Sequence, residues 1–422
     1  MMSQLLANTP SAFRRAWLNP ITLWIGFVVV HVWVSALGLY GPGYPLGDIS
    51  GVYTFWAGHA YAGDFIVGIT TPWVYPIVAL VPILVAGVAG MENYVVVFLA
   101  IVAIVDAVVF GLLIRRVKNQ TMDAARAVAA WWWLALLVCL GPVALGRIDA
   151  ISTPIALLGL LYLLKFPRTA GALLAVAAWV KVWPAAIVGA ALIALRSRRA
   201  VLNGALITSG SVVAIALVMG SGLNVASFIT QQTSRGLQIE SPAATAYLWQ
   251  VNLGAPDVGV YYDEQILTYQ ISAPGVEIIG SLTTVLMALF TLLIVAVGIL
   301  AIRRGADQQD VLFALALAFT VELIAFNKVG SPQFMGWLAV PIVAGLVYQP
   351  DRFRVPAVIA LIMAGLTQML YPYSYDNLLR TQTLELTIIT IRNVLEFVLL
   401  GLAIRMLLGS LKQSTNVTAD KL

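Results

Sequence analysis

One carboxylate and a few scattered cations are the residues of this sequence with the clearest chemical potential. Asp48 follows the first long apolar segment, and Lys181, Arg235 and Lys328 lie apart from the other basic residues. A carboxylate can accept a proton from an attacking hydroxyl group, and cations stabilise an anionic leaving group such as a phosphate. If the fold brings these four side chains together, they predict a reaction in which a hydroxyl displaces a phosphate.

The composition indicates that these residues belong to a membrane protein. Hydrophobic residues make up 61% of the 422 residues, charged residues only 10%, and the mean hydropathy is +0.93. Soluble proteins have about 45–50% apolar and about 25% charged residues. The sequence therefore predicts an all-α polytopic membrane protein. Its net charge of +5 is explained by basic loops, so no nucleic-acid partner is expected, and the single cysteine, Cys139, excludes an intrachain disulfide.

The distribution of basic residues predicts how the chain crosses the bilayer. Most of the 24 lysines and arginines cluster at the ends of apolar segments. The positive-inside rule assigns these clusters, and both termini, to the cytoplasmic side of the plasma membrane. Six cations do not fit this assignment and are expected outside or within the membrane: Arg147, Lys181, Arg235, Lys328, Arg380 and Arg392. A charge at a helix centre costs roughly 2.5–3.5 kcal/mol, so such residues usually have a function.

About twelve transmembrane segments are expected. Residues 72–90 are not counted, because a crossing there would place Arg115 and Arg116 outside; they are predicted to form short interfacial or re-entrant helices. Residues 170–195 are too short to cross twice. They are predicted to form a hairpin of two half-helices that turns at Lys181–Pro184. The segments are 21–40, 92–114, 124–142, 150–164, the two halves of 170–195, 201–220, 277–302, 309–326, 333–348, 354–371 and 384–407.

Further substrate-binding candidates collect on the predicted outer face. In the first outer loop, Asp48 is expected to be the catalytic base, with capping of an interfacial helix as the alternative. Arg147 and Asp149 could bind substrate or form a local ion pair. Lys181, Arg235 and Lys328 are expected to bind a phosphate, and the remaining substrate-binding candidates are His59, Gln238, Glu240 and Gln333.

No Walker loop, dinucleotide fingerprint, HExxH sequence or Cys/His cluster occurs in the sequence. ATP, NAD and zinc are therefore not expected, and neither is any other cofactor or metal. Nucleotide sugars are cytoplasmic, so a sugar transferase facing outward must take its sugar from a lipid phosphate. Direct attack by an acceptor hydroxyl, with Asp48 as general base, would invert the anomeric centre.

The same residues resemble the GT-C superfamily of polyprenol-phosphate-sugar glycosyltransferases. They are most similar to the actinobacterial family 87 mannosyltransferases that elongate phosphatidylinositol mannosides. The resemblance lies in four features: Asp48 with Val52-Tyr53, Tyr75-Pro76, Lys181-Val182-Trp183-Pro184, and Ser331-Pro332-Gln333 followed by Trp337. A single Gly47-Asp48 stands where many GT-C members have two acidic residues, which argues against a metal-dependent variant.

This resemblance implies a GT-C fold with outer-face juxtamembrane helices and an aspartate base at Asp48. It divides the chain into a conserved transmembrane module (1–220, with the first outer loop 41–90), a large outer loop (221–276), variable helices (277–408) and a cytoplasmic tail (409–422). The implied donor is polyprenyl-phosphate-mannose and the acceptor a lipid or glycolipid. Three alternatives remain open: transfer of arabinose from polyprenyl-phosphate-arabinose, transport of a lipid or anion, and an inactive scaffold.

Overall fold

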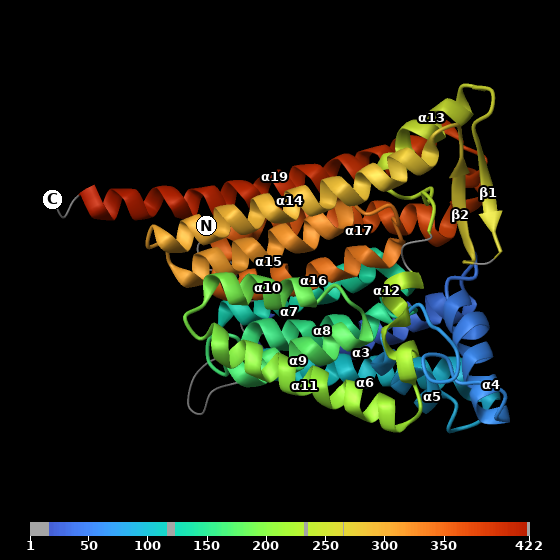
Figure 1. Cartoon of the computed structure of the whole chain (residues 1–422), viewed down its shortest axis with the longest axis horizontal. Helices are drawn as coiled ribbons and strands as arrows, with labels where there is room; N and C mark the ends of the chain where they lie inside the picture. The colour runs from blue at the N-terminus through green and yellow to red at the C-terminus, as the bar shows by residue number, and fades with distance from the viewer. Residues whose placement is uncertain (1–16, 116–122, 232–234, 265, 420–422) are drawn as a thin grey trace.

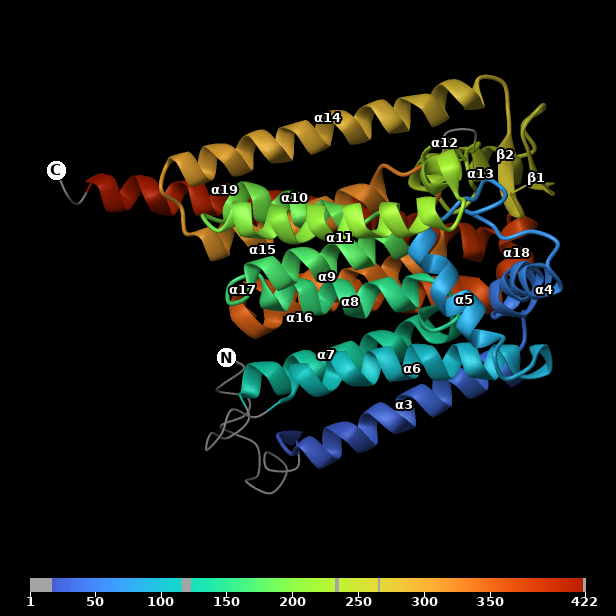
Figure 2. The ribbon, with the colours of Figure 1, turned by 60° about the horizontal axis from the view of Figure 1, so that its bottom comes forward.

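The protein is a bundle of roughly parallel helices with a small polar cap at one end. The computed structural model describes residues 17–115, 123–231, 235–264 and 266–419, with side chains described as far as Leu411. Its helices run along the long axis of the molecule (Figure 1). Helix α3 begins, and α19 ends, at the same end of the bundle, opposite the cap (Figures 1 and 2).

Eight helices of the described ranges are long and apolar enough to cross a membrane. They are α3 (Pro20–Tyr40), α6 (Tyr94–Leu113), α7 (Ala124–Leu140), α11 (Arg198–Val218), α14 (Val276–Arg303), α15 (Gln308–Ala325), α17 (Pro350–Gln368) and α19 (Thr383–Ala419). Four shorter helices match the remaining expected segments: α8 (Asp149–Tyr162), α9 (Pro167–Val180), α10 (Ala185–Ala194) and α16 (Ala339–Tyr348). The prediction of an all-α polytopic membrane protein is confirmed. Helix α19 is longer than expected, because it continues through most of the predicted tail.

Residues 167–194 form a hairpin of two short helices that turns where the sequence predicts. Helix α9 ends at Val180, Lys181 has an extended backbone, and α10 begins after Pro184. Proline lacks a backbone N–H group and fits the first turn of a helix, so the turn falls immediately before α10. Helix α10 packs against α11, α14 and α15. The turn therefore lies among the membrane helices, with Lys181 in it.

The polar cap is built from the short elements that connect the long helices. It contains η1 (Asp48–Tyr53), α4 (Thr54–Ala62), η2 (Ile77–Ala79), α5 (Leu80–Ala86), η5 (Gly222–Ala226), α12 (Ser227–Gln231), η6 (Pro242–Ala244), α13 (Thr245–Asn252), η8 (Met369–Tyr373) and α18 (Tyr375–Leu379). The short helices within residues 72–90 agree with the prediction for that stretch. An antiparallel hairpin of β1 (Gly259–Asp263) and β2 (Thr268–Ser272) was not predicted. Its tyrosines, valine, isoleucine and threonine favour strands, but the segment is short.

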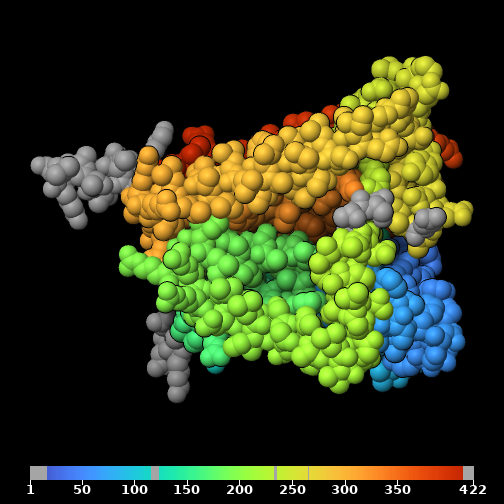
Figure 3. Space-filling model, in the orientation of Figure 1, coloured from blue at the N-terminus to red at the C-terminus, as the bar shows by residue number. Residues whose placement is uncertain are grey.

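The surface is hollowed beside the helical hairpin formed by α9 and α10. Figure 3 shows a recess with α14 along one side and α11 along the other, closed at the cap end by α12. Both long helices expose apolar side chains. Examples are Leu282 and Leu289 of α14 and Ile207 and Ile215 of α11. A recess between such helices is accessible to a hydrocarbon chain.

Candidate active site

Asp48 lies in the first turn of η1 and forms an ion pair with Arg147. Its Oδ2 atom is 3.1 Å from Nε of Arg147, and the Asp48 side chain is 35% exposed, whereas that of Arg147 is 7% exposed. Arg147 precedes α8 and also donates to the carbonyl oxygens of Pro45 and Gly146 and to the hydroxyl of Tyr371. Asp48 thus has a buried cationic partner on one side and an accessible face on the other.

Two alternatives from the sequence are wrong. Asp48 does not cap a helix: the residue at the cap position of η1 is Gly47, and no side chain makes a capping bond there. Arg147 and Asp149 do not pair with each other either, because each pairs with a residue distant in the sequence. Asp149 is the first residue of α8, so its side chain projects from a different side of the chain than that of Arg147.

Asp149 holds Lys181 at the turn of the hairpin. The Lys181 Nζ atom is 3.4 Å from Oδ2 of Asp149, and Oδ1 accepts a 2.7 Å hydrogen bond from the indole of Trp337. The ammonium group also lies 4.6 Å from the centre of the Tyr75 ring, close enough for a cation–π interaction. The sequence predicted that Lys181 binds a phosphate. The structure supplies a carboxylate and an aromatic ring, while the side chain remains 18% exposed.

Arg235 brings the two predicted lysines into one electrostatic group. It interacts with both Lys181 and Lys328. Burial, and then the charge of Arg235, lower the pKa of Lys328. The Nε atom of Arg235 is buried and has no hydrogen-bond partner within the part of the chain that the structure describes. Three cations that repel one another are stabilised when an anion binds between them.

Gln238 and Glu240 lie beside these cations. The backbone N–H of Gln238 donates to the carbonyl oxygen of Lys328, and its side chain donates to the Glu240 carboxylate at 3.0 Å. Glu240 also hydrogen-bonds the Tyr375 hydroxyl and interacts electrostatically with Arg147. Burial raises the pKa of Glu240 to about 7. These contacts join eight predicted residues, which we call the polar cluster: Asp48, Arg147, Asp149, Lys181, Arg235, Gln238, Glu240 and Lys328.

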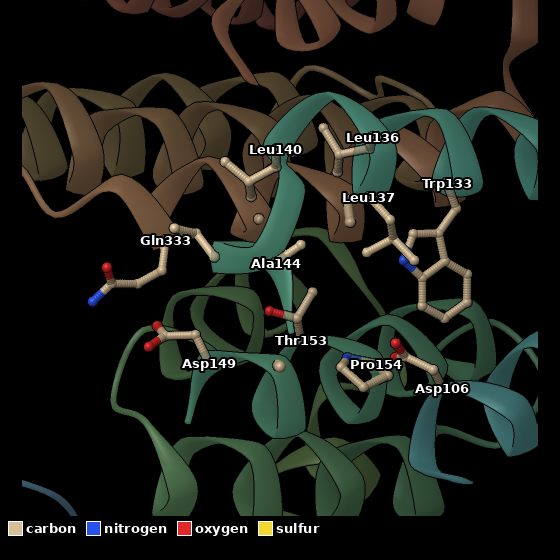
Figure 4. Close-up of a pocket in the computed structure, with 14 residues that line it drawn as sticks. Asp106, Trp133, Leu136, Leu137, Leu140, Ala144, Asp149, Thr153, Pro154 and Gln333 are labelled. Atoms are coloured by element: carbon tan, nitrogen blue, oxygen red, sulfur yellow. The ribbon is translucent and has the colours of Figure 1, made fainter. Parts of the chain in front are cut away.

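Gln333 lies next to the polar cluster, at a small internal cavity. Figure 4 shows its amide and the Asp149 carboxylate on the same side of this cavity, with Thr153 between them and Asp106. His59 is placed elsewhere, towards the far end of α4. It pairs with Asp64 at 2.7 Å and stacks on Phe65, neither of which belongs to the polar cluster.

The sequence did not indicate Tyr371, whose hydroxyl accepts from Arg147 across 224 residues. Tyr53, which the resemblance includes, is fully buried, and its hydroxyl accepts a 3.1 Å bond from the backbone N–H of Ile148. A second omission is the pair His31–Asp106, whose Nε2 and Oδ2 atoms are 3.1 Å apart between α3 and α6. A histidine and an aspartate within apolar segments are themselves a sequence signal, since such residues need a partner in the membrane.

The model of Glycosyltransferase family 87 matches residues 73–327, more than half of the chain. The chain belongs to glycosyltransferase family 87. This confirms the family expected from the sequence, and with it a glycosyltransferase rather than a transporter. No curated protein matches the chain.

The geometry of this family 87 glycosyltransferase combines a partly exposed carboxylate with a group of cations. The polar cluster contains four cations (Arg147, Lys181, Arg235 and Lys328) and three carboxyl groups (Asp48, Asp149 and Glu240), so its formal charge is positive. Such a charge favours an anionic substrate. Within the described ranges, no group of three or more histidine, cysteine, aspartate or glutamate side chains could hold a metal ion; a metal-independent reaction remains a prediction.

Proposed function

We propose that the protein transfers a sugar, in the first instance mannose, from a polyprenyl-phosphate donor to a lipid or glycolipid acceptor. The observation that carries this proposal is the group formed by Lys181, Arg235 and Lys328, which Gln238, Glu240 and Arg147 connect to the partly exposed carboxylate of Asp48. A phosphate leaving group needs cations, and an acceptor hydroxyl needs a base. The recess between α14 and α11 supports a lipid-linked donor, because it offers room for a hydrocarbon chain beside the bundle (Figure 3).

The reaction is a direct displacement. Asp48 accepts the proton of the acceptor hydroxyl while the hydroxyl oxygen forms a bond to the anomeric carbon of the sugar. The bond from that carbon to the phosphate oxygen breaks, and its electron pair stays with the polyprenyl phosphate. Lys181, Arg235 and Lys328 stabilise the charge that develops on the phosphate. A single displacement inverts the anomeric centre, and no cofactor takes part.

The proposed location is the plasma membrane, with the polar cap facing outward and both termini in the cytoplasm. Clustering of basic residues at the opposite ends of the long helices supports this orientation, for example Arg303 and Arg304 at the end of α14. Polyprenyl-phosphate-arabinose is the second donor to consider, because both donors present the same phosphate to the same cations.

The test incubates membranes containing the protein with a lipid extract and either labelled polyprenyl-phosphate-mannose or labelled polyprenyl-phosphate-arabinose. We expect labelled glycolipid from the mannose donor, with an inverted anomeric configuration by NMR. Asp48→Asn should lower the rate by about 10²–10⁴-fold, the usual contribution of a general base. Arg235→Gln should raise the donor KM, whereas Arg304→Gln, at the opposite end of the bundle, should leave it unchanged.

Full activity of Asp48→Asn would remove the proposed base. Product from a nucleotide sugar, and from neither lipid donor, would contradict the donor class. Product from the arabinose donor alone would replace mannose while leaving the mechanism in place.

A further inference from the structure

The guanidinium group of Arg147 is directed at the protein rather than at a substrate. Arginine has five N–H donors. In this structure Nε faces Asp48, Nη1 donates to Pro45 and Gly146, and Nη2 donates to Tyr371. Three N–H donors thus make hydrogen bonds within the protein, Nε takes part in the ion pair, and the side chain is buried. Arg147, which the sequence suggested as a substrate-binding residue, is therefore placed to hold Asp48 and the turn before it.

That turn is also held by η8. Gly43 has a φ of +81°, and a Cβ atom at this residue would lie 2.5 Å from the carbonyl oxygen of Pro372. The two backbones can approach this closely only because residue 43 is glycine. Tyr371, the neighbour of Pro372, binds the same arginine that binds Pro45. Residues 43–48 thus meet η8 both directly and through Arg147.

We infer that Arg147 and Tyr371 are positioning residues, which fix the Asp48 carboxylate in the orientation that accepts the acceptor proton. This inference rests on the proposed function of Asp48. Asp48 and Tyr371 both contact Arg147, and both lie outside the segment 73–327 that matches the family. The C-terminal part of the chain, whose helices were expected to be variable, therefore supplies a residue, Tyr371, that helps to position Asp48.

The physical reason is that an ion pair fixes only one oxygen of the Asp48 carboxylate. Arg147 contacts Oδ2, while the side chain as a whole remains 35% exposed, so the carboxylate can still accept a proton from an acceptor. A long arginine side chain has several rotamers, and contacts at both ends of its guanidinium group select one of them. Nη1 is held by the carbonyl oxygens of Pro45 and Gly146, and Tyr371 adds the contact at Nη2. Misplacing a reacting group by about 1 Å can cost on the order of 100-fold in rate.

The test compares Tyr371→Phe with Tyr373→Phe in the full-length protein. Tyr373 belongs to the same short element but is 43% exposed, so its variant is a matched control. Tyr371→Phe removes one hydrogen bond to a charged group, for which we expect about a tenfold lower kcat. The donor KM should stay unchanged, because the cations that bind the phosphate are not altered. Gly43→Ala, which disturbs the turn from the opposite side, should lower kcat in the same way.

Thermal midpoints and elution profiles of each variant in detergent separate positioning from folding. A Tyr371→Phe protein with the same kcat as Tyr373→Phe would overturn the inference. So would a loss that is fully explained by an unfolded fraction, or one that appears only in KM. If Asp48→Asn is inactive and Tyr371→Phe is unaffected, only the positioning role fails; if Asp48→Asn is active, the proposed base itself fails.

Discussion

At the scale of a single residue, burial in the protein changes the pKa of the Glu240 carboxyl group. It is 4% exposed, and burial raises its pKa from 4.5 to about 7, although Arg392, Arg147, Gln238 and Tyr375 act in the opposite direction. Glu240 therefore changes its charge near neutral pH, between the cations of the site and Tyr375. Its protonation affects both the charge of the polar cluster and the stability of the fold.

Replacing Glu240 should change how stability depends on pH. Because the folded state binds the proton more tightly than the unfolded state, this group stabilises the protein fully below about pH 4.5. That stabilisation, on the order of 3 kcal/mol, is lost as the pH rises to about 7. Glu240→Gln cannot titrate, so its thermal midpoint in detergent should fall less between pH 5 and pH 8 than that of the unmodified protein.

Glu264→Gln provides the control for this measurement, because Glu264 is exposed in the turn of the strand hairpin. Its pH dependence should match that of the unmodified protein. An equal fall in all three proteins would show that Glu240 has an ordinary pKa in the folded state.

At the scale of elements, the position of Lys181 depends on how closely α9 packs against α11. A Cβ atom at Gly204 would lie 2.0 Å from the carbonyl oxygen of Arg168, and one at Gly171 would lie 2.0 Å from that of Val201. Small residues at such crossings allow the backbones of membrane helices to approach closely. The hydroxyl of Ser209 on α11 also accepts a bond from Trp179 on α9. Because α9 is packed tightly against α11, the position of Lys181 at the end of α9 is fixed.

Gly204→Ala should destabilise the protein, because the new methyl group cannot fit without moving one helix. Overpacking of this kind costs about 1–3 kcal/mol. We expect a lower thermal midpoint and, because α9 shifts, a higher donor KM. Gly210→Ala lies on the same helix in open space and should change neither quantity. Equal midpoints for the two variants would contradict the close packing of α9 on α11.

At the scale of the whole molecule, one end of the bundle carries the polar cluster and the other end carries basic residues. Arg392 of α19 is fully buried, lies 3.7 Å from Glu396, and donates to Asn393 and to the backbone carbonyl of Glu240. The last long helix therefore holds the loop that contains Gln238 and Glu240. Segments from both halves of the chain meet in the cap, which makes the site a property of the complete bundle.

The proposed orientation predicts which residues can be labelled from outside the cell. In a Cys139→Ser background, a cysteine replacing Leu267 in the turn between β1 and β2 should react with a membrane-impermeant maleimide on intact cells. A cysteine replacing Arg304, between α14 and α15, should react only after the membrane is permeabilised. The reverse pattern would place the polar cluster on the cytoplasmic side.

The sequence by itself determined the helices, because apolar runs, prolines and basic clusters are local properties. It located the turn at Lys181–Pro184 and all eight residues of the polar cluster in this way. It could not determine the partners of those residues. Arg147 is two residues from Asp149 but binds Asp48 and Tyr371, at sequence separations of 99 and 224. His31 likewise binds Asp106, 75 residues away.

Only the tertiary structure decided these pairings, because the side chains that meet in the cap depend on how the helices pack and on where each helix ends. A shift of one residue at the start of α8 would turn Asp149 away from Lys181. A side chain larger than hydrogen at Gly43 would separate η8 from the turn before Asp48. The charge and apolar character of each segment can be read directly from the sequence. The partner of each charge depends on distances that arise only when the chain is folded.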